Sequence, residues 1–468
     1  TGKSNNAQFG SSINLFGRNE NWFFDSRITT MDYGDYRVPT DVVHVYSYAV
    51  PLYKNHLRNT AGRELDFHLS SGYSGEHFKS VFYFSNVHTK SGFFANAHGL
   101  EPRNVDLELH DKSSRDILMP YQQVNHLKVS NTTSFQLGNH AFETQIGFQN
   151  NFRREYSHYV NHGYMPPIYP EDMYAPQDLE RQYNKDVWSF SAKDEFRIQN
   201  HQITVGSNLA FQQNEIGGWS FLIPAFTQFN AGLFAYDKIE LNEKWFLNGA
   251  VRYDYGKIKM KSYYDWFQSP VSENNQTELE YLQRSQDLTK TFDSFTWSIG
   301  ANYNPGKLSL KANLGSSFRM PIAKELASNG VNYHYFRFEK GNPNLDAERS
   351  YQLDLGMEWN QQNWSFQLTP FVNYFPNFIY LNPTSTHDIY YGAGNQVFEY
   401  EQSKVFRYGA ELQTRYYFLK SLSAEIGAEY LYSEQKSGSK KGYTLPFSPP
   451  PSVLFGLNYE PQISFLKE

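Results

Sequence analysis

An all-β fold, a transmembrane antiparallel β-barrel, is the fold class that the sequence predicts, on three observations. Long segments alternate between apolar and polar residues, Phe, Trp and Tyr make up 18% of the chain, and short connections alternate with long ones. A membrane barrel accounts for all three, because its strands face lipid on one side and a watery lumen on the other, with aromatic girdles at both interfaces. Counting the segments on both sides of the short and long connections gives roughly 17 to 18 candidate strands, and a strand needs about 9 to 11 residues to span a membrane.

Composition excludes several other classes of protein. No apolar run approaches the roughly 18 to 20 residues that a spanning helix needs, since His44, Tyr46 and Ser47 interrupt one of the densest runs, residues 42–50. The chain has no cysteine, which rules out disulfides and thiolate metal sites. Its net charge of -6 argues against a nucleic-acid partner, because a phosphate backbone favours a basic surface.

Period-two alternation is clearest near the carboxyl end, in residues 422–432. One face carries apolar side chains and the other carries Ser423, Glu425, Gly427 and Glu429. A soluble sheet with one solvated face also alternates. The segments here run to about 10 to 15 residues, however, against a usual strand of about 5 to 6. The same alternation is expected in residues 142–149, 245–255, 351–359 and 407–418.

Connection lengths support the membrane barrel. Short turns are expected at residues 200–201, 242–244, 305–306, 361–363 and 419–421. Long connections are expected at about residues 92–121, 158–187, 217–231, 261–293, 319–349, 382–396 and 435–448. Short turns at one end and long loops at the other are typical of outer-membrane barrels.

One long connection contains an ordered series of motifs. Its residues are Phe318, Arg319, Met320 and Pro321, then Glu325 and Leu326, then Gly330, and finally Gly341, Asn342, Pro343, Asn344 and Leu345 with Glu348. The series resembles the barrel signature of TonB-dependent outer-membrane receptors, in the form common among Bacteroidetes-type receptors. Residues 90–99, 149–155, 214–224, 249–254 and 445–450 fit the same resemblance.

These motif residues also make physical sense without the resemblance. Arg319 and Glu325 are expected just beyond a strand end, where Pro321 stops ladder pairing. Gly341, Asn342 and Pro343 are turn residues, and Glu348 leads the chain back into the sheet. An Arg–Glu network there would hold the long loop in one arrangement. We expect an architectural role for these residues, with ligand binding as the alternative.

The resemblance implies a 22-stranded barrel filled by an amino-terminal plug domain. Neither a plug nor a segment that engages the energy-coupling protein is recognisable, so residues 1–468 are expected to be a receptor barrel domain truncated at both ends, from a longer product or a split gene. The implied location is the cell outer membrane. The implied partners are outer-membrane lipid and lipopolysaccharide, the TonB complex acting through the missing plug segment, and, as a further candidate, a surface lipoprotein.

The resemblance further implies energy-coupled uptake of a ferric siderophore, haem or a similar nutrient complex. The aromatic loop near residue 160 would stack on a flat ligand, and a loop imidazole would suit haem iron. The spacing of His158 and His162 would favour a metal only on a helix, which the Pro and Gly content makes doubtful. No cofactor, resident metal or catalytic residue is expected. The ligand-binding candidates are Tyr156, His158, Tyr159, His162, Tyr164 and His334.

Three other functions stay open at this point. A passive porin shares the barrel and the loops, although the ordered series from Phe318 to Glu348 argues against it. An outer-membrane enzyme would need an acid–base or nucleophilic set at the rim, and none is evident in the sequence. An importer of cobalamin or oligosaccharides would share the whole fold.

Overall fold

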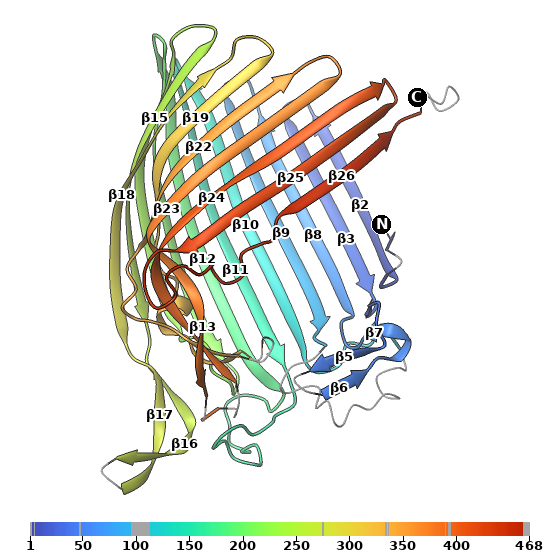
Figure 1. Cartoon of the computed structure of the whole chain (residues 1–468), viewed down its shortest axis with the longest axis vertical. Coiled ribbons are helices and arrows are strands. Elements are labelled where there is room, and N and C mark those ends of the chain that lie inside the picture. The colour runs from blue at the N-terminus through green and yellow to red at the C-terminus, as the bar shows by residue number, and fades with distance from the viewer. Residues whose placement is uncertain are drawn as a thin grey trace.

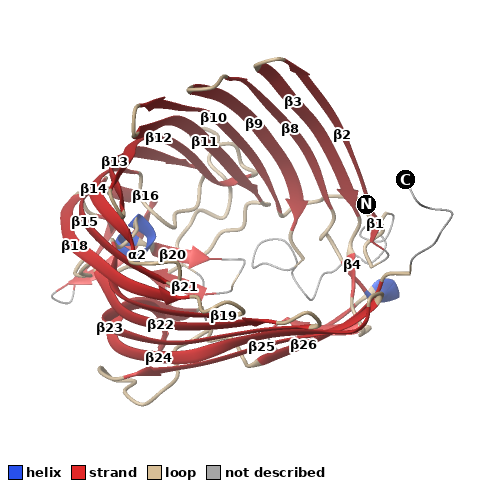
Figure 2. Ribbon diagram, turned by 90° about the horizontal axis from the view of Figure 1, so that it is seen from above, coloured by secondary structure: helices blue, strands red, loops and turns tan. Residues whose placement is uncertain are grey.

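The chain forms one large antiparallel sheet that curves into a barrel wall. The computed structural model describes residues 2–3, 5–45, 48–94, 113–273, 276–332, 335, 337–388, 390–391 and 395–461. Twenty strands of the described residues belong to the sheet. Seen from the side and from above, they curve around a central space that is open on one side, with loops gathered at one end (Figure 1 and Figure 2).

Seventeen of the twenty strands make the wall, because β1 (Gly2–Lys3), β20 (Asn329–Asn332) and β21 (Arg337–Lys340) are short additions. The fold class and the expected number of strands are confirmed. The wall strands are β2 (Gln8–Asn19), β3 (Trp22–Tyr33), β8 (Gly62–Ser74), β9 (Phe78–Gly92), β10 (Tyr121–Leu137), β11 (His140–Tyr156), β12 (Leu179–Ile198), β13 (His201–Gly217), β14 (Phe226–Glu240), β15 (Trp245–Met260), β18 (Leu288–Tyr303), β19 (Leu308–Arg319), β22 (Glu348–Asn360), β23 (Trp364–His387), β24 (Gln396–Leu419), β25 (Leu422–Gln435) and β26 (Ser452–Tyr459).

Each wall strand pairs antiparallel with the next one in this order. Within the described ranges, β2 pairs with β3 and β1, and β26 pairs with β25 alone, so these two strands are the edges of the wall.

The two faces of the wall differ as the alternation predicts. On β15, Val251, Tyr253 and Tyr255 are apolar or aromatic yet exposed, as side chains in contact with lipid are. Between them, Arg252 and Asp254 point to the other face and form an ion pair with 2.6 Å between Nη2 and Oδ1. A polar lumen accommodates such pairs.

Aromatic side chains mark the end of the wall that has the short turns. Stacked or edge-on rings lie directly before and after these turns, as at an interface with lipid headgroups. The ring pairs are Phe135 with Phe142, Trp245 with Tyr303, and Trp359 with Trp364.

The long connections lie at the other end, and all seven that were expected are present. Four of them are shorter than expected, because β12 begins at Leu179, β14 at Phe226 and β18 at Leu288, and because β23 continues to His387. On β12 the outward face carries Gln182, Asn184 and Asp186 near this end. This part of the strand therefore extends beyond the lipid. Because polar and apolar residues no longer alternate there, the sequence did not predict that the strand begins so early.

An eighth long connection, residues 34–61, was not anticipated. It contains β4 (Tyr36–Arg37), β5 (Val42–Val45), β6 (Tyr48–Pro51), the short 3-10 helix η1 (Tyr53–Asn55) and β7 (His56–Leu57). The apolar run that was noted for its density forms the β5–β6 hairpin of this loop.

Other short elements sit in the loops that follow β15 and β19. They are the hairpin of β16 (Tyr263–Glu273) and β17 (Gln276–Ser285), the helix α2 (Ala323–Ala327), and β20 and β21. In the described part of the chain, no helix is long and apolar enough to cross a membrane. The buried apolar clusters involve these loops, so the long-loop end is where the molecule has a packed core.

Candidate functional site

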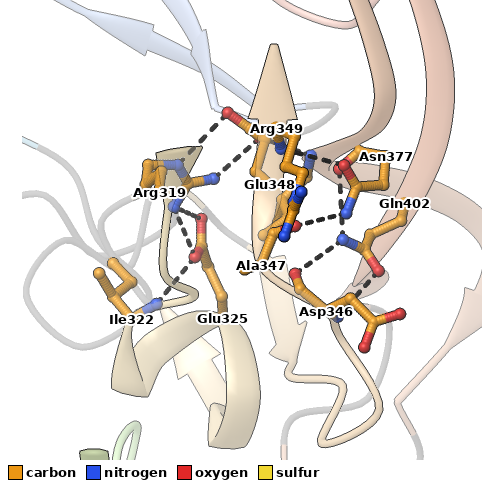
Figure 3. Close-up of polar contacts among 10 residues, drawn as sticks. Arg319, Ile322, Glu325, Asp346, Ala347, Glu348, Arg349, Asn377 and Gln402 are labelled. Atoms are coloured by element: carbon orange, nitrogen blue, oxygen red, sulfur yellow. Dashed lines mark hydrogen bonds and ion pairs between the residues drawn. The ribbon is translucent and has the colours of Figure 1, made fainter. Parts of the chain in front are cut away.

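A charged cluster closes the base of the loop between β19 and β22. Arg319, the last residue of β19, donates two hydrogen bonds from Nη1 to the carboxylate of Glu325, at 3.0 and 2.8 Å. Its Nη2 donates to Oε2 of Glu348, the first residue of β22, at 3.1 Å. Glu325 also accepts the backbone N–H of Ile322 at 2.9 Å and so caps α2 (Figure 3). The predicted Arg–Glu network is therefore present.

A second set of hydrogen bonds fastens the start of β22 to its neighbours β23 and β24. Gln402 accepts the N–H of Asp346 at 3.0 Å and donates to the carbonyl of the same residue at 2.9 Å. Asn377 donates to the carbonyl of Ala347 and accepts the N–H of Arg349 (Figure 3). Both ends of the loop are thus held on the wall.

The remaining motif residues pack the loop against the same region. Leu345 is buried in one apolar cluster with Leu326, and Phe318 lies against it. Lys290 of β18 donates to the carbonyls of Pro343 and Leu345, at 2.6 and 3.0 Å. These contacts hold the loop against the wall.

Gly341 and Asn342 complete the turn of this loop. A Cβ at Gly341 would lie 2.4 Å from the backbone nitrogen of Ala327, so only glycine fits there. The Asn342 side-chain oxygen accepts the N–H of Asn344 at 2.9 Å, which closes a local turn.

The middle of the loop folds over the lumen rather than away from it. Figure 2 shows α2 and β20 within the ring of wall strands. There β21 pairs in parallel with the start of β24, from Arg337 opposite Gln396 to Lys340 opposite Glu399. Glu339 of β21 is buried between Lys324, at 2.6 Å, and Arg337, at 2.8 Å. Burial opposes ionisation of Glu339, but these two cations outweigh it and hold its pKa below the usual value.

A buried ion pair joins two further loops, the one between β15 and β18 and the one between β23 and β24, to the loop between β19 and β22. Together these loops form a roof over this region. Asp265 of β16 and Arg284 of β17 lie 3.0 Å apart, with side chains only 3% and 5% exposed. The hydroxyl of Tyr391 donates to Asp265 at 2.7 Å, and the guanidinium of Arg284 lies 3.5 Å from the centre of the Tyr391 ring. Arg284 also donates to the carbonyl of Asn329 at 2.9 Å. Burial raises the pKa of Asp265, against the opposing effects of Arg284 and Tyr391.

The aromatic candidates of the loop near residue 160 are not all on its surface. Tyr159 packs in the roof against Trp219, with ring centres 5.3 Å apart, and its hydroxyl donates to the carbonyl of Pro166 at 2.6 Å. Tyr156 ends β11 and stacks on Tyr121 at 4.8 Å. Tyr164 is 47% exposed and lies 6.3 Å from Tyr390. Of these candidates, Tyr164 is the one with a freely accessible ring.

The histidine candidates are not gathered at one point. His158 is exposed and His162 is half-buried, in a connection without a helix. His334, like its neighbour Tyr333, lies outside the described residues. In the ranges that the structure describes, no group of three or more His, Asp or Glu side chains is arranged to hold a metal ion.

A cavity of about 400 Å³ lies against the lumen face of β11, β12 and β13, and part of its lining comes from the loop between β19 and β22. The register places Lys185 of β12 opposite both Asn151 of β11 and Asn214 of β13, so their side chains share this face. Lys324 of α2 also lines the cavity. The cavity is thus polar, lies inside the wall and is covered by the inward-folded loop.

An ion-pair network anchors the loop beside the cavity. Arg181 is buried and donates from Nε to Glu155 at 2.7 Å, and it also pairs with Glu180 at 3.1 Å. Its Nη1 donates to the carbonyl of Val331 in β20 at 3.2 Å. This guanidinium therefore links the wall directly to the loop.

The polar residues of this cavity were not among the candidates predicted from sequence. The segments 149–155 and 214–224 were noted only as part of the resemblance. A usable signal was the run of alternate residues Arg181, Tyr183 and Lys185, which places two basic side chains on one lumen face next to Arg153 of the neighbouring strand.

Comparisons with known proteins agree with this architecture. A family model described as "TonB dependent receptor-like, beta-barrel" matches residues 1–465. Among solved structures, the copper transporter OprC is similar with a TM-score of 0.69 at 13% identity, over 97% of this chain and 64% of that one. The FrpB iron transporter from Neisseria meningitidis has a TM-score of 0.67 at 12% identity, over 98% and 65%.

The ferric enterobactin receptor PfeA is similar to the same degree, with a TM-score of 0.67 at 13% identity. The match covers 98% of this chain and 64% of that receptor. The chain thus spans about two thirds or slightly less of the length of these solved proteins. At such low identity the likeness concerns the fold.

Proposed function

Since the chain belongs to the family of TonB-dependent receptor-like β-barrels, we propose that the protein takes up an iron complex across the outer membrane by energy-coupled transport. The ligand is a ferric siderophore, haem or a similar scarce nutrient complex. The observation that supports this most is the family match over residues 1–465. Similar folds are found in proteins described as iron, ferric siderophore and copper transporters or receptors.

The polar lumen and its cover are consistent with such a role. The loop between β19 and β22 folds into the barrel, and the packed roof lies at the same end. A cavity below this cover would hold a ligand taken from the long-loop side. Tyr164, and His158 and His334 on the loops, are proposed as first contacts for the ligand.

The proposed partners follow from the same family. They are the TonB complex as the source of energy, and the lipid and lipopolysaccharide of the outer membrane around the wall. A surface lipoprotein that helps to capture the ligand is a further proposed partner.

Uptake by cells tests this proposal. A strain that lacks the gene is compared with a complemented strain under iron limitation, using radioactive iron supplied as iron(III) citrate, as an iron(III) catecholate siderophore and as haem. Loss of uptake of one of these sources, restored by the gene and abolished by a protonophore, is the expected result. Unchanged uptake of every source would contradict the iron proposal.

The protonophore separates active transport from the passive alternative. A porin allows diffusion down a gradient and needs no proton-motive force. Uptake that depends on the gene but persists with the protonophore would therefore favour a passive channel.

A further inference from the structure

We infer that the cavity against β11, β12 and β13 is a binding site for an oxyanion, so that the ligand carries exposed carboxylate, catecholate or phosphate oxygens. This inference rests on the proposed function and names the chemical class of its substrate. It is drawn from four side chains that line the cavity, namely Arg153, Lys185, Asn214 and Lys324.

Asn214 is the most informative of these residues. Its side chain is only 4% exposed, and its amide nitrogen Nδ2 is buried with no hydrogen-bond acceptor among the described residues. A buried donor without an acceptor is costly, so such groups in native proteins call for an explanation. An oxygen atom of a bound ligand would supply the acceptor.

A second unused donor lies on the neighbouring strand. Nε of Arg153 is buried and makes no hydrogen bond to any residue that the structure describes, while Nη2 of the same side chain pairs with Glu155. Arg153 and Asn214 lie on the lumen faces of β11 and β13, on either side of β12. The two unused groups are both donors, which suits an acceptor-rich ligand.

The charges around the cavity favour an anion. Lys185 lies between these donors on β12 and forms no ion pair in the described part of the chain. Lys324 and Arg337 share the single carboxylate of Glu339. Lys185 therefore has no counter-charge within the described ranges, and the group of Lys324, Arg337 and Glu339 has one positive charge in excess.

The other ion pairs at the cavity are balanced. The guanidinium groups of Arg153 and Arg181 face the carboxylates of Glu155 and Glu180. The cavity is therefore net positive, which attracts a negative group. A cationic complex would be repelled, and a neutral one would gain no attraction from the two uncompensated positive charges.

Binding measurements on the protein as cells make it, purified in detergent, test the inference. The probes are iron(III) citrate and an iron(III) tris-catecholate as anionic chelates, a neutral iron(III) trihydroxamate, and inorganic phosphate. Lys185→Gln and Asn214→Asp are each expected to weaken binding of an anionic chelate about tenfold, because each removes one charge-assisted hydrogen bond. Lys185→Arg keeps the charge and should retain most of the affinity.

Lys193→Gln is the matched control. Lys193 lies on the same face of β12, eight positions along, and pairs with Glu143 at 3.1 Å outside the cavity. Its substitution should leave the affinity within about twofold, the level at which a distant screened charge acts. Circular dichroism and the melting temperature confirm that each variant is folded.

The possible outcomes distinguish a metal chelate from a free anion as the bound oxyanion. They also distinguish failure of this inference from failure of the proposed transport function. Phosphate that binds alone, with the same losses in Lys185→Gln and Asn214→Asp, would support the site and identify a free anion as its occupant. Affinity for the anionic chelates that is unchanged in both variants, or their absence of binding to the wild type, would overturn the inference. If the cell assay, extended to the neutral iron(III) trihydroxamate, then showed gene-dependent uptake that a protonophore abolishes, the proposed transport would still be supported.

Discussion

Arg319 and Glu348 end and begin two wall strands that pair directly with each other, and their side chains are bonded at 3.1 Å across the loop between them. Glu325 shares the same guanidinium from within the loop. Arg319 at the end of β19 thus links Glu325 in the loop to Glu348 at the start of β22.

Removal of Arg319 should loosen the loop while the barrel remains. Arg319→Ala leaves two largely buried carboxylates without a counter-charge, which costs several kcal/mol in a fully buried site. The Arg319 side chain is 41% exposed, so solvent screening reduces the expected loss to about 2 kcal/mol of local stability. Hydrogen exchange of residues 320–347 should increase on the order of tenfold or more.

Arg415→Ala is the control for this substitution. Arg415 is 42% exposed and pairs with Glu425 at 2.6 Å on the wall. Its loss should not change exchange in residues 320–347. Equal effects of the two variants would show that the loop does not depend on the Arg319 network.

The roof should depend on the buried pair of Asp265 and Arg284. Asp265→Asn leaves Arg284 buried and without its charged partner, which is expected to cost about 3–5 kcal/mol of local stability. Increased proteolysis of the β16–β17 hairpin would reveal the loss. The double variant Asp265→Leu with Arg284→Met removes both charges and should recover part of the stability; no recovery would contradict the assigned electrostatic cause.

The wall could be predicted from sequence because lipid and water impose a local signal on every strand. Val251 and Arg252 alternate for this reason, and no contact distant in sequence is needed to see it. The motif loop could also be bounded, since Pro321 stops the ladder after Arg319 and Glu348 starts the next strand. These two features depend on neighbours in the chain.

The loop end could not be predicted, because its contacts join residues far apart in sequence. The partner of Tyr159 is Trp219, and the hydroxyl of Tyr391 reaches Asp265, 126 positions away. Likewise, nothing local to Asn214 reveals that its amide is buried in a cavity. The candidate site could therefore be found only from the three-dimensional structure. For the loop near residue 160, the sequence showed the high content of aromatic residues but not which of them are exposed.

The close approach of two loops predicts a specific effect at Gly163. Gly163 has a φ of +56°, and an added Cβ would lie 1.4 Å from the carbonyl oxygen of Tyr390. Gly163→Ala should therefore separate the two loops. Gly438 has a φ of +77° with nothing within 4 Å of an added Cβ, so Gly438→Ala should cost only the backbone strain of about 1–2 kcal/mol.

The comparison isolates the steric contribution. Gly163→Ala should cost about 1–3 kcal/mol more than Gly438→Ala, as overpacking does, measured as the local free energy of opening by hydrogen exchange in each loop. Equal costs at the two positions would indicate that Tyr390 moves aside without resistance.

Residues 34–61 should lose stability as the pH rises through the acid range, because of Asp35. Its carboxylate accepts the N–H groups of Thr60 and Ala61 at 2.7 and 3.0 Å, and burial raises its pKa from 3.8 to about 6. Since the folded loop binds this proton more tightly than the unfolded loop, the stabilisation is complete below about pH 4 and is lost between about pH 4 and 6. Hydrogen exchange of these residues, corrected for the intrinsic pH dependence of exchange, should show the decline.

Asp35→Asn is the control, because it keeps an acceptor for both N–H groups but cannot ionise. The stability of the loop in this variant should not vary between about pH 4 and 6. A decline that persists in Asp35→Asn would assign the effect to another group.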